Sequence, residues 1–326
     1  MQLIDWIDLN GSKMLKKFII FSPSYSYESG GVAVLHKLCH LLNENGYEAY
    51  LYPAYKTQVV HQRNWVRPLL SILAAALKSK YFRPFKVRSD LITPIFHGSV
   101  KPADDCVAIY SEGVLGNPLG AKYVVRWLLH QPGYNYNLTC FGNYELIFSY
   151  NKSYALNFQM PFSKLADTLI YVPYENLSYY NQEDALPFEE RTGVAYCLRK
   201  GINKPRVHDE SDSILIDGLS HEEISSIFKR VKTFISYDTK TAFSAFAAIC
   251  GADSIVIPDP GVKLEAWEPD VRYRYGIAYG FENVEWARQT RPLMMDEIQN
   301  DINKVPEMIH SFVKEVNSYF PCKPFR

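Results

Sequence analysis

The segment 234–258 joins an apolar run, a cluster of polar side chains and a second apolar run. The run that ends before Tyr237 is typical of a buried parallel strand. Asp238, Thr239 and Thr241 are residue types that end a strand and cap the helix that follows. Ligands of parallel α/β sheets bind at the carboxyl ends of strands and at helix N-termini. We therefore expect Tyr237 to Thr241 to face an anionic ligand.

Two other segments also suit an anion. The loop 22–31 ends in Gly30-Gly31, which allows a tight turn and a close approach of ligand to backbone at a helix N-terminus. It matches neither G-x-G-x-x-G nor a Walker loop, so NAD binding is not supported. Arg199 and Lys200 follow a predicted strand and would neutralise a diphosphate. The alternatives are an ordinary turn for the glycines and a solvated loop for the basic pair.

Two glutamates are candidates for acid–base chemistry. Glu112 lies just past the strand predicted at 107–110, and Glu28 lies in the first loop. A carboxylate at a strand end serves as a general base or orients a substrate hydroxyl. The alternative interpretation is that both are ordinary loop residues.

The composition excludes several classes of protein. The 326 residues include 35 Lys and Arg and 35 Asp and Glu, and this absence of net charge argues against nucleic-acid binding. The six cysteines form no C-x-x-C pair, so we expect reduced thiols, and no zinc site is legible among the eight histidines, so we expect no metal. The acidic clusters 104–105 and 209–212 resemble metal sites, but we interpret them as solvated turns. Without an export signal or a long apolar span we expect a cytoplasmic protein, with residues 1–13 a tag or a loose extension.

Strands and helices alternate along the first half, as in a doubly wound sheet. Gly46 ends the first predicted helix. A second helix is predicted over 117–130, with Asn117 as its cap and Pro118 at its first position. The predicted strands are 16–22, 48–52, 91–96, 106–110 and 145–149, and the first helix is 32–45.

The second half repeats this alternation, so the predicted fold is α/β, with two Rossmann-like domains facing a central cleft. The predicted domains are 1–165 and 166–326, and the last helix, 304–319, is expected to pack back on the N-terminal domain. Ser220 and Glu223 form a capping box. The remaining predicted strands are 168–172, 194–198, 213–216, 234–237 and 254–257, with a helix at 242–250.

A basic stretch lies between these elements. Residues 63–88 hold seven Lys and Arg and no acidic residue, and they flank the apolar segment 69–77. Such a segment, with Trp65 beside it, can lie on an anionic membrane face. The alternative is a core helix with charged ends.

Several segments resemble one family. Gly30-Gly31, the helix 32–45 and the strand after Gly46 are similar to the opening of the GT-B-fold glycosyltransferases, and 116–129 and 236–239 resemble segments of members from polysaccharide clusters. The chain as a whole resembles a GT-B glycosyltransferase of bacterial surface-polysaccharide biosynthesis. In that family the N-terminal domain takes the acceptor and the C-terminal domain takes the nucleotide-sugar.

The resemblance implies a role for each candidate residue and no cofactor or metal beyond the nucleotide-sugar substrate. Arg199 and Lys200 would hold the donor diphosphate, with Tyr237, Asp238, Thr239 and Thr241 on the sugar or ribose hydroxyls. The Gly30-Gly31 loop would close over the donor, and Glu112 or Glu28 would meet the hydroxyl of a glycan or lipid-linked acceptor. Peripheral contact with the inner membrane face would run through residues 63–88.

The chain departs from the family at one motif. Retaining members carry Glu-x7-Glu before a Cys-Gly step, and alignment on Cys250-Gly251 places these glutamates at Asp238 and Phe246. The second carboxylate is absent, so Ser244 or Thr241 would have to replace it, and the donor nucleotide and stereochemistry stay open. Two alternative functions remain: a nucleotide-sugar epimerase with the same layout, and a two-domain sugar- or nucleotide-binding protein without catalysis.

Overall fold

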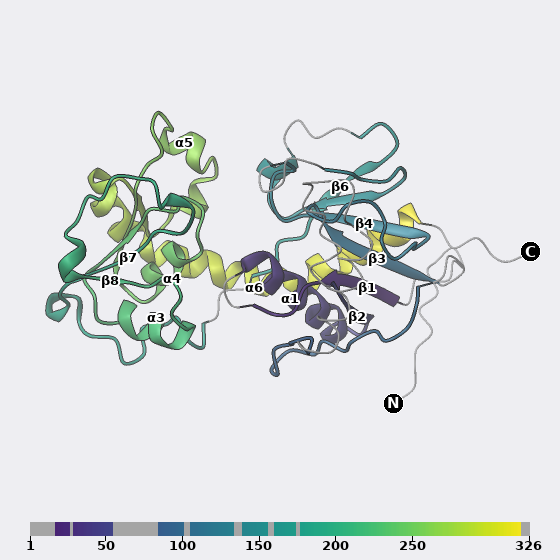
Figure 1. Cartoon of the computed structure of the whole chain (residues 1–326), viewed down its shortest axis with the longest axis horizontal. Helices are drawn as coiled ribbons and strands as arrows, with labels where there is room; N and C mark the ends of the chain where they lie inside the picture. The colour runs from purple at the N-terminus through teal and green to yellow at the C-terminus, as the bar shows by residue number, and fades with distance from the viewer. Residues whose placement is uncertain are drawn as a thin grey trace, which may run out of the picture. The chain divides into compact units, whose positions relative to one another are not determined.

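The chain forms two compact α/β units, one from Met1–Tyr174 with Lys304–Arg326 and the other from Glu175–Asn303 (Figure 1). We call them unit 1 and unit 2. The computed structural model describes residues 17–26, 29–54, 84–100, 105–133, 139–155, 160–173 and 177–320. Glu28, residues 1–13 and most of the basic stretch 63–88 lie outside these ranges.

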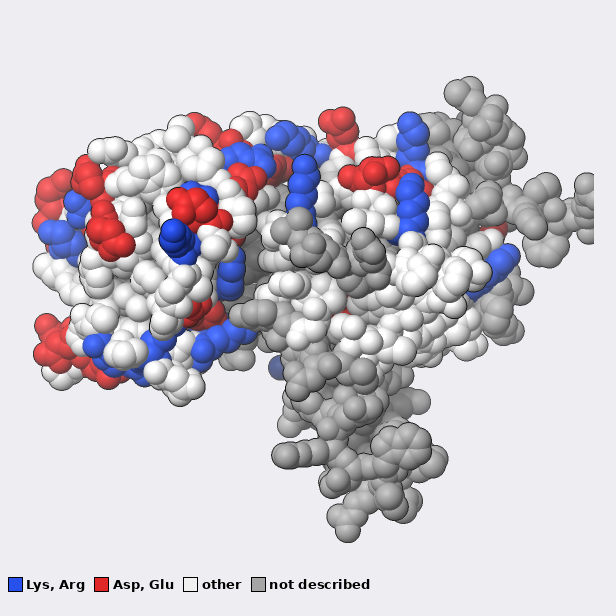
Figure 2. Space-filling model, turned by 90° about the horizontal axis from the view of Figure 1, so that it is seen from above, with Lys and Arg blue, Asp and Glu red and all other residues white. Residues whose placement is uncertain are grey.

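Charged side chains of both signs are mixed on one face of unit 2 (Figure 2). Figure 2 shows Lys and Arg next to Asp and Glu across this unit, at the left of the view, with no field of one sign. No helix within the described ranges has the length and apolar character needed to span a bilayer. Membrane contact through residues 63–88 stays a prediction.

Unit 1 contains a sheet of six parallel strands in the order β2-β1-β3-β4-β5-β6. The four inner strands are short and largely buried, as expected of strands covered on both faces, whereas the two edge strands are partly exposed. Helix α1 (Gly30–Glu44) connects the first two strands. The strands are β1 (Lys17–Ser22), β2 (Glu48–Pro53), β3 (Cys106–Ser111), β4 (Tyr123–Leu128), β5 (Leu146–Ser149) and β6 (Lys164–Leu169).

Unit 2 contains five parallel strands in the order β11-β10-β9-β7-β8. Helix α3 begins with the predicted capping box of Ser220 and Glu223. The strands are β7 (Val194–Cys197), β8 (Ser213–Leu215), β9 (Thr233–Ser236), β10 (Asp253–Val256) and β11 (Ile277–Tyr279), and the helices are α3 (His221–Phe228), α4 (Phe243–Ile249) and α5 (Leu264–Trp267). Two Rossmann-like parallel α/β units confirm the predicted fold class. That they face a common cleft stays a prediction.

Helix α6 (Val284–Tyr319) is much longer than the predicted helix 304–319. Pro292 and Pro306 lie inside it, and proline usually ends a helix, which explains the short prediction. Its residues from Lys304 onward belong to unit 1. The predicted domain boundary at 165/166 falls inside β6.

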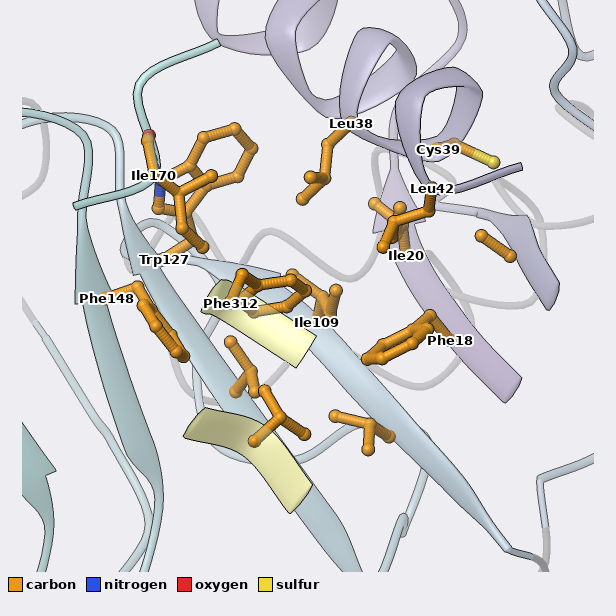
Figure 3. Close-up of a cluster of buried hydrophobic side chains, with 14 of the residues drawn as sticks. Phe18, Ile20, Leu38, Cys39, Leu42, Ile109, Trp127, Phe148, Ile170 and Phe312 are labelled. Carbon is orange, nitrogen blue, oxygen red and sulfur yellow. Dashed lines mark hydrogen bonds between the residues drawn. The ribbon is translucent and has the colours of Figure 1, made fainter. Parts of the chain in front are cut away.

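One apolar core joins helices α1 and α6 to the sheet of unit 1. Figure 3 shows Leu38 and Leu42 of α1 pointing toward Ile20 and Ile109 of the sheet. Phe312 of α6 belongs to the same core, and its ring centroid lies 5.6 Å from that of Phe18 and 4.9 Å from that of Phe148. The carboxyl-terminal part of α6 is therefore part of unit 1.

A carboxylate of α6 covers the free edge of β6. Glu315 accepts hydrogen bonds from the backbone N–H groups of Asp167 at 3.0 Å and Thr168 at 3.1 Å. Lys164 also lies 3.5 Å from this carboxylate. An edge strand exposes unpaired backbone groups, and Glu315 satisfies two of them.

Two predicted elements of unit 1 are wrong. Residues 117–130 do not form a helix: Asn117 closes a turn onto the backbone of Ala121, and the β-branched and aromatic residues after it form β4. Residues 91–96 do not form a strand either, because they make a single bridge, between Leu51 and Ile95.

A buried ion pair ties β4 to the start of β5. Arg126, which is 0% exposed, donates to both carboxylate oxygens of Glu145, at 2.9 and 2.8 Å. It also donates to the carbonyl oxygens of Val114 and Gly116. Glu145 is therefore both the counter-charge of this buried guanidinium and the acceptor of two of its N–H groups.

Glu145→Gln should lower the free energy of unfolding by about 3–5 kcal/mol, because it leaves a buried guanidinium without a counter-charge. Denaturant unfolding at neutral pH measures the loss. The matched control is Glu48→Gln, which removes an exposed partner of Lys17 and should cost less than about 1 kcal/mol. Equal losses for the two variants would contradict this account.

Candidate functional site

Each sheet has one point where the order of its strands reverses. In unit 1 this point lies between β1 and β3, and in unit 2 between β7 and β9. Crevices at the carboxyl ends of such strand pairs are the usual ligand sites of open α/β sheets. The described candidate residues of unit 1 lie in or beside the loops after β1 and β3. Those of unit 2 lie in or beside the loops after β7 and β9.

The basic pair of unit 2 lies on a tight turn after β7. Leu198 has right-handed helical dihedral angles, and Arg199 follows with φ of +42°. A left-handed arginine costs about 1–2 kcal/mol, so the surroundings must impose this conformation. Successive residues of this kind direct their N–H groups toward one point, a geometry that binds anions. Lys200 continues the turn and is exposed.

The end of this turn touches the loop after β9. A Cβ atom on Gly201 would lie 1.9 Å from the carbonyl oxygen of Tyr237. No side chain fits there, because the contact is backbone against backbone. The two loops at the reversal point of unit 2 are therefore fixed to each other.

Asp238 lies in the same place. Its carboxylate is 3.9 Å from Nε of Arg199 and accepts a hydrogen bond from the N–H of Lys240 at 3.1 Å. The residue is only 5% exposed, and Ser236 donates to its carbonyl oxygen. The structure thus brings Arg199 and Asp238 together.

Tyr237 does not face a ligand. Its side chain is 0% exposed, and its hydroxyl accepts the N–H of Val207 and bonds Nδ1 of His208, both at 2.8 Å. The prediction that it contacts the donor is wrong for this conformation, because the ring fills the core. Tyr237 instead anchors the loop that carries His208.

Thr239 joins the loop after β10. Its hydroxyl donates to Asp259 at 3.1 Å, and Asp259 also pairs with Lys204 at 2.7 Å. Trp267 donates its indole N–H to the carbonyl of Thr239. Sequence reasoning missed Lys204 and Asp259, although both follow predicted strands.

Thr241 and Ser244 lie near the start of α4. The expected side-chain cap is absent: Ala242 is the N-cap, and the Thr241 hydroxyl accepts a long 3.4 Å bond from the N–H of Phe243. Ser244 is buried, and its hydroxyl has no hydrogen-bond partner among the described residues. Of the two, only Ser244 has an unsatisfied polar atom inside the unit.

The site of unit 1 is built on the N-terminus of α1. Gly30 and Gly31 open the helix, and Ser29 caps it by accepting the N–H of Val32. A Cβ atom on Gly31 would lie 3.7 Å from the side chain of Leu129, at the end of β4. The glycine pair therefore lies beside the end of β4, with Gly31 exposed.

Glu112 lies at the end of β3 and also contacts the end of β4. Its carboxylate, 8% exposed, accepts the N–H of Leu129 at 2.9 Å. Burial raises the pKa of Glu112, although backbone hydrogen bonds from Leu129 and His130 oppose part of the rise. The structure thus brings Glu112, Leu129 and Gly31 together. His130, which stacks on Tyr154 at 5.3 Å, was not singled out from the sequence.

The described residues contain no group of three or more His, Cys, Asp or Glu that could hold a metal ion. Two further basic side chains of unit 2 lie beside carboxylates: Lys240 is 3.2 Å from Glu268, and Arg206 is 3.2 Å from Glu210. An anionic ligand would therefore compete with internal carboxylates for these cations.

No protein-family model matches the chain, and no curated protein matches it. Solved structures of similar fold include the T4 phage β-glucosyltransferase in complex with UDP-glucose, with 10% identity and a TM-score of 0.45, covering 92% of this chain and 99% of that one. Another structure of the phage enzyme contains UDP and Mn²⁺, with the same TM-score. Spinosyn forosaminyltransferase matches with 10% identity and a TM-score of 0.32, covering 92% and 93%. At these values the similarity does not decide what this chain does.

Gly201→Ala should cost about 3 kcal/mol of unfolding free energy, because the new methyl group collides with a backbone carbonyl that cannot move alone. Denaturant unfolding measures the loss. Gly31→Ala is the matched control: like Gly201 it does not need a left-handed backbone, but a Cβ atom there meets only the Leu129 side chain, at an ordinary 3.7 Å. If Gly31→Ala costs as much, the loss of a glycine in itself rather than the contact with Tyr237 explains the effect.

Glu112→Gln should alter how stability depends on pH. Since the folded state raises the pKa of Glu112, its contribution to stability is complete below the unfolded pKa of about 4.3 and declines as pH rises through the folded value. Glutamine still accepts the N–H of Leu129 and does not ionise. The melting temperature of the variant, relative to that of the parent, should therefore rise as pH increases from the unfolded to the folded pKa of Glu112. A difference in melting temperature that stays constant with pH would refute this.

Proposed function

We propose that this protein is a glycosyltransferase that moves a sugar from a nucleotide-sugar to a glycan or lipid-linked acceptor of surface polysaccharide. The main support is the placement of Arg199, Lys200 and Asp238 at the strand reversal of unit 2. The resemblance of the opening segments to the GT-B family supports the same activity.

The donor would bind to unit 2. Arg199 and Lys200 would meet the diphosphate and stabilise the negative charge that grows as the sugar–oxygen bond breaks. Asp238 and Thr239 would take hydroxyl groups of the sugar or ribose, with Ser244 as a further hydroxyl partner. The nucleoside diphosphate leaves with the electron pair of the broken bond.

The acceptor would bind to unit 1. Glu112 would take the proton of the attacking hydroxyl, whose oxygen forms the new bond to the sugar. A carboxylate whose pKa is raised by burial is a better base than an exposed one. No metal is required in this proposal, because Arg199 and Lys200 would supply positive charge to the diphosphate. Transfer should therefore survive removal of divalent cations with EDTA.

Lys200→Ala should weaken the binding of a nucleoside diphosphate about tenfold, because one charged partner of the phosphates is lost. Thermal shifts with UDP, GDP, ADP and dTDP identify the base, and calorimetry with that nucleotide gives the affinity. Lys232→Ala is the matched control, since this lysine precedes β9 and contacts the Phe188 ring, away from the strand tips.

The reaction is then followed with the matching nucleotide-sugar. When the sugar of this donor carries a label, passage of the label into membrane glycolipid or polysaccharide supports transfer. Isomerised free donor would instead identify an epimerase, and binding without turnover would identify a binding protein. Unchanged affinity in Lys200→Ala would remove the phosphate role of this turn.

A further inference from the structure

We infer that Asp217 is a positioning residue, which holds the turn 198–201 in the form that directs Arg199 and Lys200 to a diphosphate. The inference rests on the proposed function and names a residue that this function does not itself require. Asp217 follows β8, the edge strand that pairs with β7. Its carboxylate therefore lies beside the end of β7, where the turn begins.

One oxygen of Asp217 binds two successive backbone groups. Oδ2 accepts the N–H of Leu198 and the N–H of Arg199, each at 3.0 Å. Both donors reach one atom because the right-handed dihedral angles of Leu198 turn its N–H and the next N–H to the same side, and the left-handed Arg199 then closes the turn. The carboxylate thus fills the anion-binding concavity that this pair of conformations forms.

The turn is strained and is held at both ends. Asp217 binds its first two N–H groups, and Gly201 contacts the carbonyl of Tyr237 at its other end. Without the carboxylate, the two N–H groups lose their acceptor and Arg199 is no longer kept at positive φ. A return to negative φ changes the direction in which its side chain leaves the backbone, away from Asp238 and Phe243.

Only one half of the carboxylate makes hydrogen bonds. Oδ1 is buried and has no partner among the described residues. Asparagine can therefore place its carbonyl oxygen on the two N–H groups without breaking another bond. The opposite interpretation is that Asp217 occupies the place of a phosphate, in which case its removal would strengthen anion binding.

The test is titration calorimetry with sodium pyrophosphate, which presents the diphosphate without a base. Asp217→Ala should weaken binding about tenfold, and Asp217→Asn should stay within about threefold of the parent. Asp209→Ala is the matched control: this aspartate also accepts a backbone N–H, from Ser211, but in the loop before β8. It should bind like the parent. A purely structural defect lowers thermal stability without this rescue of affinity by asparagine.

A second variant tests the mechanism, whether or not Asp217→Ala folds well. Glycine adopts positive φ without strain, so in an Arg199→Gly background the turn no longer needs its anchor. Asp217→Ala should then change pyrophosphate affinity by less than about twofold, a clear coupling in a double-mutant cycle. Equal effects in both backgrounds, or tighter binding by Asp217→Ala, would overturn the inference. If Lys200→Ala leaves pyrophosphate binding unchanged, the proposed function fails instead.

Discussion

The contact between Gly201 and the carbonyl of Tyr237 is the constraint on which the candidate site of unit 2 depends. Parallel pairing sets Cys197 beside Ser236, so the chains leaving β7 and β9 start next to each other. Their close approach beyond the strands requires that position 201 has no side chain. The strained turn that carries the basic pair is thus a consequence of sheet register and one glycine.

Much of this arrangement could be predicted from the sequence. Apolar runs followed by polar residues mark parallel strands and their ends, and these rules found Glu112, Arg199 and Asp238 at the reversal points. The two domain-sized alternations of strand and helix gave the fold class. These features are local, because a strand and the residue after it are contiguous in the chain.

The features that the sequence did not predict depend on contacts between residues far apart in the chain. Tyr237 follows a strand and has the right chemistry, but the nearby loop at Val207 and His208 buries it. Asp217 follows a predicted strand, but its inferred role depends on a hydrogen bond to Leu198, 19 residues earlier in the chain. The spacing of residues in the sequence does not reveal this contact. Asn117 and Pro118 are residue types that often start a helix, but the β-branched and aromatic residues that follow them form the buried strand β4.

The cover that Glu315 places on β6 has a consequence for association between molecules. Burial raises the pKa of Glu315, but the bonds from Asp167 and Thr168 outweigh it, so the net shift is downward. The cover therefore persists through mild acid and is lost as pH falls through the lowered value. In strong acid the protonated Glu315 would no longer hold the backbone N–H groups of β6, and a neighbouring copy could then pair with this edge strand.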